Sequence, residues 1–247
     1  MSGLFEAQYR ALFARLLVSH RGAAQRRPRA PAMWCAFWPM IGRKFAPGGL
    51  MIVGRAVNGW KETEFACEEL DPPGGIEGLM GRCREVFAPA DKCPMAWVER
   101  HWKPHEGYRL SRSQFWQTAL RLAKKDGYSD QDWYSTLVWT NLMRVSPVRG
   151  GNPPMWSCFA QLEPAAELLD YELKTLQPAV AVFLTGREWY RCFQEKTDLF
   201  HLEEVSQDYV HYVGQHGRTR LIVSDHPQTR SPERLVGQIA EYWRARS

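Results

Sequence analysis

The spacing of apolar residues along the chain predicts where strands and helices lie. Short runs of β-branched and other apolar residues predict buried strands. These runs lie at 49–54, 136–142, 179–185 and 220–224. Apolar residues that return every three or four positions, together with capping and breaking residues, predict helices instead. The predicted helices lie at 4–18, 112–125, 162–176, about 187–195 and 232–244, and a hairpin is predicted around Gly214–Gly217.

Strands that alternate with helices predict an α/β fold with a four-stranded, mainly parallel sheet flanked by helices. We expect residues 1–31 to form an amino-terminal helix and a basic loop. Residues 32–247 are expected to form a single α/β domain, with an inserted loop-rich segment at about 71–108. In such sheets ligands bind outside the carboxyl ends of the strands, so the loops after the four strands are where a site is expected.

The composition adds several expectations. The chain has 247 residues, of which 45% are hydrophobic and 24% charged, as in ordinary globular proteins. Its apolar runs fall far short of a membrane span, so we expect a cytoplasmic protein without a membrane partner. Six cysteines without a CxxC pair indicate reduced thiols. The spacing of Cys83, Cys93, His101 and His105 fits no common zinc module, and phosphate-loop and GxGxxG motifs are absent, so we expect no metal or cofactor.

The positive charge is concentrated at the amino terminus. The net charge is +5, and residues 1–50 carry eight basic residues against one acid, Glu6. Such a segment attracts phosphates, which predicts DNA binding that weakens steeply with salt. We expect removal of residues 1–31 to weaken DNA binding without destroying the fold. The alternative is that residues 20–31 are a solvated basic loop with no ligand.

Polar residues follow the predicted strands. Asn58 comes soon after the first strand, Asn141 ends the second, and Asp225 and His226 follow the fourth. The carboxyl ends of parallel strands share one edge of a sheet. We therefore expect Asn58, Asn141 and His226 to meet there.

Five segments resemble the uracil-DNA glycosylase superfamily over roughly residues 38–244. They are LMIVGRAVNGW, SRSQFW, LVWTNLMRV, PAVAVFLTG and LIVSDHPQ. The resemblance is to a divergent, bacterial-type member and implies base excision in DNA repair. It implies a hydrolase that cleaves the N-glycosidic bond of uracil or another damaged base in single- or double-stranded DNA. We expect the chain to act as a monomer.

The resemblance also assigns roles to individual residues. Asn58 would position the attacking water, His226 would stabilise the leaving base, and Asn141 would read the base edge. The extruded base needs an aromatic wall, for which Trp60, Phe115 and Trp116 are candidates. The candidate phosphate ligands are Arg55, Arg144, Arg149 and Arg230.

Two positions depart from the pattern of that superfamily. Ala56-Val57 stands where an X-Pro pair is usual, and the last loop reads His-Pro-Gln in place of His-Pro-Ser. These departures favour an alternative, a catalytically inactive nucleic-acid-binding relative. A second alternative is a small-molecule hydrolase that uses the same pocket at the strand ends.

Overall fold

A computed structural model describes residues 3–104, 106, 109–127, 131–197, 200–228 and 230–244. The chain forms two compact units, each assembled from three separate segments. Unit 1 comprises residues 1–39, 55–90 and 141–175, and unit 2 comprises residues 40–54, 91–140 and 176–247. None of the described helices is long and apolar enough to cross a membrane.

Unit 1 combines helices with a small sheet. Its helices are α1 (Gly3–Gln25), α2 (Gly75–Phe87) and α5 (Met155–Leu176), with short 3-10 turns η1 (Lys61–Thr63) and η2 (Cys67–Leu70). Its strands are β1 (Trp34–Ala36), β4 (Glu64–Phe65) and β6 (Val145–Pro147). Strand β1 lies in the middle and pairs antiparallel with both β4 and β6.

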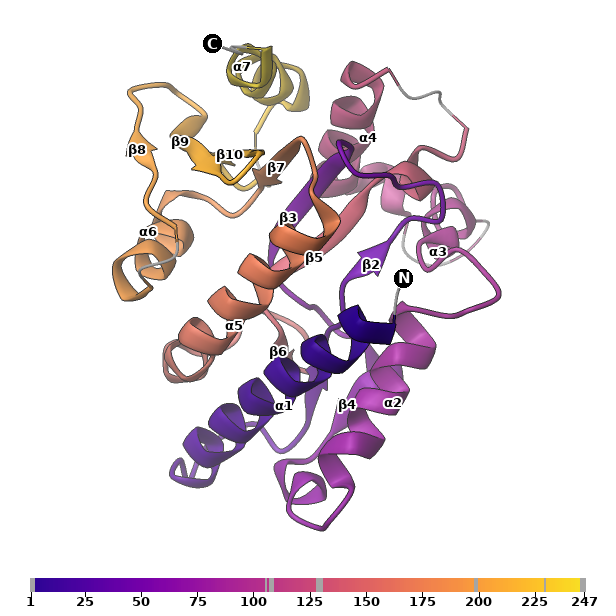
Figure 1. Cartoon of the computed structure of the whole chain (residues 1–247), viewed down its shortest axis with the longest axis vertical. Coiled ribbons are helices and arrows are strands. Elements are labelled where there is room, and N and C mark those ends of the chain that lie inside the picture. The colour runs from indigo at the N-terminus through magenta and orange to yellow at the C-terminus, as the bar shows by residue number, and fades with distance from the viewer. Residues whose placement is uncertain are drawn as a thin grey trace. The chain divides into compact units, whose positions relative to one another are not determined.

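Helix α1 belongs to the core of unit 1. It lies between α2 and α5 (Figure 1), where Arg10 pairs with Glu77 of α2 and Arg15 pairs with Glu167 of α5. Its inner face is fully buried through Tyr9, Phe13, Leu16 and Leu17. The helix predicted at 4–18 is therefore present and continues to Gln25, into the segment expected to be a loop.

Unit 2 contains a seven-stranded sheet in the order β2-β5-β3-β7-β10-β9-β8. The strands are β2 (Met40–Ile41), β3 (Leu50–Ala56), β5 (Val138–Met143), β7 (Val180–Phe183), β8 (Glu203–Glu204), β9 (Val210–His216) and β10 (Thr219–Ser224). The last residues of β3 and β5 continue into unit 1. The helical elements are α3 (Ala96–Arg100), η3 (Leu110–Arg112), α4 (Gln114–Lys125), η4 (Trp133–Thr136), α6 (Arg187–Lys196) and α7 (Pro232–Arg244).

The predicted four-stranded, mainly parallel sheet is wrong, although all four predicted strands exist. They are neighbours as β5, β3, β7 and β10, and the pairs β3–β7 and β7–β10 are parallel. The sheet is nevertheless mixed and mostly antiparallel, because β2, β9 and β8 join it antiparallel to their neighbours. A tight turn at Gly217, with φ of 59°, requires β9 and β10 to run in opposite directions. The two-residue strands β2 and β8 are too short to produce an alternating sequence pattern.

Other predicted boundaries shift for local reasons. The segment 71–108, expected to be rich in loops, contains α2 and α3. Glycines interrupt the helical sequence pattern of α2, which is why the helix was not predicted. Its buried residues are Leu79, Met80, Cys83 and Phe87. Helix α4 begins after Ser113 rather than Ser111, and the Ser113 hydroxyl accepts a hydrogen bond from the Trp116 backbone amide at 3.5 Å.

Candidate functional site

The carboxyl ends of three neighbouring strands lie at one edge of the sheet in unit 2. Val53 of β3, Phe183 of β7 and Val223 of β10 are in register. Strand β7 ends at this level, β10 ends one residue later, and β3 continues to Ala56. Gly186 follows β7, and its backbone amide donates to the Ser224 carbonyl at 2.9 Å. Its φ of 86° is a conformation that glycine adopts without strain. Backbone bonds therefore fix where the loop after β10 begins.

His226 lies in that loop and is half-buried. The Gln228 backbone amide donates to its Nδ1 at 3.3 Å. A neutral imidazole that accepts at Nδ1 carries its hydrogen on Nε2. This tautomer can donate a hydrogen bond to an oxygen on which negative charge develops, as predicted for His226.

Asp225, next to His226, holds two other side chains. Its Oδ1 lies 2.9 Å from His211 Nε2, and its Oδ2 lies 2.8 Å from Arg230 Nε. The Asp225 and His211 side chains are only 16% and 12% exposed. Sequence reasoning missed His211, because only the register of the β9–β10 hairpin brings it to the end of β10. Arg230, a predicted phosphate ligand, is instead oriented by a carboxylate through its Nε.

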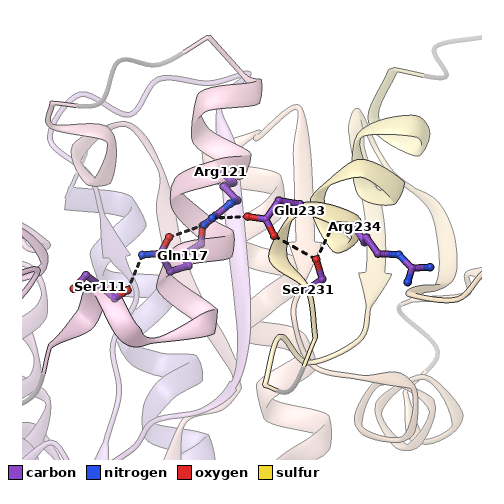
Figure 2. Close-up of polar contacts among 6 residues, drawn as sticks. All are labelled: Ser111, Gln117, Arg121, Ser231, Glu233 and Arg234. Carbon is purple, nitrogen blue, oxygen red and sulfur yellow. Dashed lines mark hydrogen bonds and ion pairs between the residues drawn. The ribbon is translucent and has the colours of Figure 1, made fainter.

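A chain of polar contacts links the start of α7 to α4 (Figure 2). Arg121 of α4 donates to Glu233 of α7 at 2.6 Å and to the Gln117 side chain at 2.6 Å. Gln117 in turn donates to the Ser111 carbonyl at 2.7 Å, while Ser231 donates to Glu233 at 3.3 Å. A hydrogen bond from its own backbone amide and the Arg121 guanidinium lower the pKa of Glu233. The loop that carries His226 therefore ends at a helix fixed to α4.

The aromatic candidates differ in accessibility. Trp116 is 5% exposed and packs edge-on against Trp97 and Trp139, so it is a core residue of unit 2 rather than a stacking surface. Phe115 is half-buried beside Trp116. Trp60 is half-buried in unit 1, where its ring meets Phe87 edge-on at 4.9 Å. Phe115 and Trp60 are thus less buried than Trp116.

Asn58 forms a hydrogen bond to a neighbouring loop of unit 1. The side chain is exposed, and its Oδ1 accepts a hydrogen bond from the Gly151 backbone amide at 3.0 Å. Gly150 and Gly151 have φ of 88° and 90°, and a Cβ at Gly150 would lie 2.8 Å from Asn58 Oδ1. The amide oxygen that was expected to position water thus already binds the backbone of the neighbouring loop.

Asn141 has a buried amide without a partner. The residue is 1% exposed, and among the described residues nothing accepts a hydrogen bond from its Nδ2. An unpaired polar group in a protein interior costs about 1–3 kcal/mol, so such groups are generally paired. A ligand acceptor that reached this amide would remove the cost of leaving it unpaired.

Arg144 does not have the position expected of a phosphate ligand. It is fully buried in unit 1, and its Nη2 lies 3.0 and 3.1 Å from the two carboxylate oxygens of Glu172. The Tyr9 hydroxyl also donates to Glu172, at 3.0 Å. The Arg144 guanidinium binds a carboxylate of its own chain in place of a phosphate.

Many of the basic residues near the amino terminus are neutralised internally. In unit 1, Arg21 pairs with Asp71 at 3.2 Å, in addition to the pairs that Arg10 and Arg15 form with α2 and α5. In unit 2, Lys44 pairs with Asp132 at 3.0 Å and lowers the pKa of that carboxyl.

Some exposed or half-buried arginines of unit 1 are candidate phosphate ligands. Arg26, Arg27 and Arg29 are exposed and form no ion pair within the part of the chain that the structure describes. Of the residues predicted for this role, Arg149 is exposed and Arg55 is half-buried. All five belong to unit 1.

No cluster of three or more potential metal ligands occurs among the described residues. His105, one of the four residues considered for zinc, lies outside them. The six cysteines are free thiols.

Asn58 and Asn141 belong to unit 1, whereas His226 belongs to unit 2, so their meeting at one site stays a prediction. No protein-family model matches the chain, and no curated protein matches it.

Proposed function

We propose that the chain is a DNA-base glycosylase-like hydrolase that cleaves the N-glycosidic bond of uracil or another damaged base. Such a reaction needs a group that reads the base, a donor for the anionic leaving base and a positioned water. The sequence resemblance assigns these roles to Asn141, His226 and Asn58. Each unit adds an observation that supports its own residues.

The buried amide of Asn141 is the observation that carries the proposal. Its Nδ2 has no acceptor among the described residues, although the side chain is 1% exposed. The edge of uracil carries a carbonyl beside an N–H. Nδ2 could donate to that carbonyl while Oδ1 accepts from the N–H. A flipped uracil would thus remove the cost of the unpaired amide.

The tautomer of His226 supports the second role. With Nδ1 accepting from the Gln228 backbone amide, Nε2 carries the hydrogen. A donor aimed at a base oxygen gains strength as that oxygen becomes negative, and this lowers the barrier rather than the energy of the bound substrate.

The direct test is base release from labelled oligonucleotides, single- and double-stranded, each with one uracil or another damaged base. Abasic sites are revealed by alkaline cleavage. We expect release from at least one substrate, and Asn141→Ala should change which base is accepted. Asn152→Ala, an exposed asparagine in unit 1, is the matched control and should behave as wild type. Absence of release from every substrate would rule out the glycosylase.

A second function is favoured by Asn58. Its Oδ1 is engaged by Gly151, and Ala56-Val57 precede it where the superfamily has an X-Pro pair. A protein that binds nucleic acid without cleaving it would need no water-positioning group. Tight, salt-sensitive DNA binding combined with no base release would identify this second function.

A further inference from the structure

We propose that Asp225 and His211 form a carboxylate–imidazole dyad in which His211 accepts a proton from the attacking water. This inference rests on the proposed hydrolase function and adds a catalytic residue to it. The dyad lies wholly in unit 2, where β9 begins and β10 ends.

The geometry determines which nitrogen of His211 is available. His211 Nε2 lies 2.9 Å from Asp225 Oδ1, and a carboxylate accepts hydrogen bonds, so Nε2 carries the hydrogen. The lone pair of a neutral imidazole is then on Nδ1. No described residue donates to this nitrogen, which is therefore able to accept a proton.

The carboxylate is itself held in place. Arg230 Nε binds Asp225 Oδ2 at 2.8 Å, and the Asp225 backbone amide donates to the Tyr209 carbonyl at 2.8 Å. The ion pair and the backbone hydrogen bond hold the carboxylate beside the His211 ring. Asp225 and Arg230 thus act as positioning residues, because they orient and stabilise the ring without contacting the substrate.

A base that accepts the proton of the attacking water would assist the reaction, and the predicted residues do not provide one. An asparagine amide can orient water but hardly accepts a proton, and the oxygen of Asn58 is already bound to Gly151. Histidine has an ordinary pKa near neutrality and serves most often as the general base.

The proposed step is hydrolysis of the N-glycosidic bond with His211 as the base. The oxygen of a water molecule forms a bond to C1′ of the sugar, and the bond from C1′ to the base nitrogen breaks with its electron pair on the base. The proton released by the water moves to His211 Nδ1. It can then pass to the departing base, which restores the neutral imidazole.

The first test does not depend on activity. Long-range ¹⁵N–¹H NMR of the full chain should show His211 with hydrogen on Nε2 and an unprotonated Nδ1 when neutral. A neutral His211 with hydrogen on Nδ1 would overturn the dyad.

The second test uses the oligonucleotide substrate that the wild-type protein cleaves. His211→Gln keeps a donor for Asp225 but provides no base, so kcat should fall by about 100-fold or more while KM and the melting temperature change little. A structural role alone would leave kcat intact in this variant, and that result would overturn the proposal. His201→Gln, an exposed histidine in unit 2, is the matched control.

The two tests separate this inference from the proposed function. A wild-type protein that releases no base refutes the glycosylase, and the NMR result alone then decides whether the dyad exists. An active enzyme with a normal rate in His211→Gln keeps the glycosylase and removes His211 from its mechanism.

Discussion

His20 is a buried histidine whose surroundings determine its protonation. Gln161 Oε1 accepts hydrogen bonds from the Arg144 and Val145 backbone amides, which fixes the orientation of that side-chain amide. Its Nε2 donates to the Ser157 hydroxyl at 3.1 Å, so Ser157 donates to His20 Nδ1 at 3.2 Å. The ring packs edge-on against Trp34 at 4.4 Å. Burial in this apolar site lowers the pKa of His20 to about 4.

We predict that this burial makes the protein less stable in acid. Between about pH 6.5 and pH 4 the unfolded histidine is protonated while His20 in the folded protein is neutral, so the unfolded state gains protons. Stability should therefore fall as the pH falls through this window, by up to about 3 kcal/mol. Urea unfolding of the wild type and His20→Gln at several pH values measures the effect. The variant should have a shallower slope, and identical slopes would exclude His20 as the cause.

His226 tests the proposed reaction at the scale of one side chain. His226→Ala should raise the activation free energy of base release by about 3 kcal/mol, because the lost donor acts on charge that develops in the transition state. The affinity for DNA should change little. Single-turnover kinetics and equilibrium binding measure the two effects separately. His201→Ala is the exposed control. An active enzyme whose rate is indifferent to His226→Ala would contradict this role.

Two elements of unit 1 are joined by the buried pair of Arg144 and Glu172. Arg144 follows β5, and Glu172 lies in α5, with the Tyr9 hydroxyl of α1 on the same carboxylate. Burial and the negative charge of Glu172 raise the pKa of Tyr9, which keeps this hydroxyl a donor. The pair is closed to solvent, unlike the partly exposed pair between Arg121 and Glu233 in unit 2.

We predict that Glu172→Gln destabilises the protein by about 3–5 kcal/mol, because it leaves a buried guanidinium without its counter-charge. Chemical denaturation of the variant and the wild type gives this difference directly. Glu163→Gln, at an exposed position of the same helix, should change stability by less than about 0.5 kcal/mol. A second substitution, Arg144→Met in the Glu172→Gln background, should recover part of the loss, since it removes the unpaired charge.

The net charge of the molecule is positive, but internal ion pairs determine which basic side chains are available to bind DNA phosphates. Removal of residues 1–31 is not a clean test of DNA binding, because Tyr9, Phe13 and Leu16 of α1 are fully buried. The expectation that the fold would survive this deletion conflicts with that burial. Point substitutions at Arg26, Arg27 and Arg29 avoid the problem, since these side chains are exposed.

We predict that DNA affinity falls steeply with salt, and that the triple change of these three arginines to glutamine lowers the log–log slope by about 2–3. Fluorescence anisotropy at salt concentrations from about 50 to 200 mM gives the slope. Arg15→Gln should leave the slope nearly unchanged, because Arg15 already pairs with Glu167. A wild-type affinity that does not depend on salt would leave the three arginines as ordinary surface residues.

Local sequence pattern determined the four central strands and most of the helices. A run such as Val180–Phe183 must be buried on both faces, and an amphipathic stretch such as that in α4 must bury one, whatever the rest of the chain does. The same pattern placed His226 just after a strand, whereas Asn141, expected at a strand end, lies within β5, which continues to Met143. The local pattern did not predict β2 and β8, because each strand has only two residues and so shows no periodicity.

Only the tertiary structure decided which polar groups meet. Tyr9 and Glu172 are 163 positions apart, and His211 and Asp225 are 14 apart across a hairpin. Arg144 looked like a phosphate ligand because a strand-end arginine has the same local sequence whether it faces solvent or a buried carboxylate. Burial and charge pairing depend on contacts between distant segments, so the partners of Arg144, Asn58 and His211 follow from packing and not from local sequence.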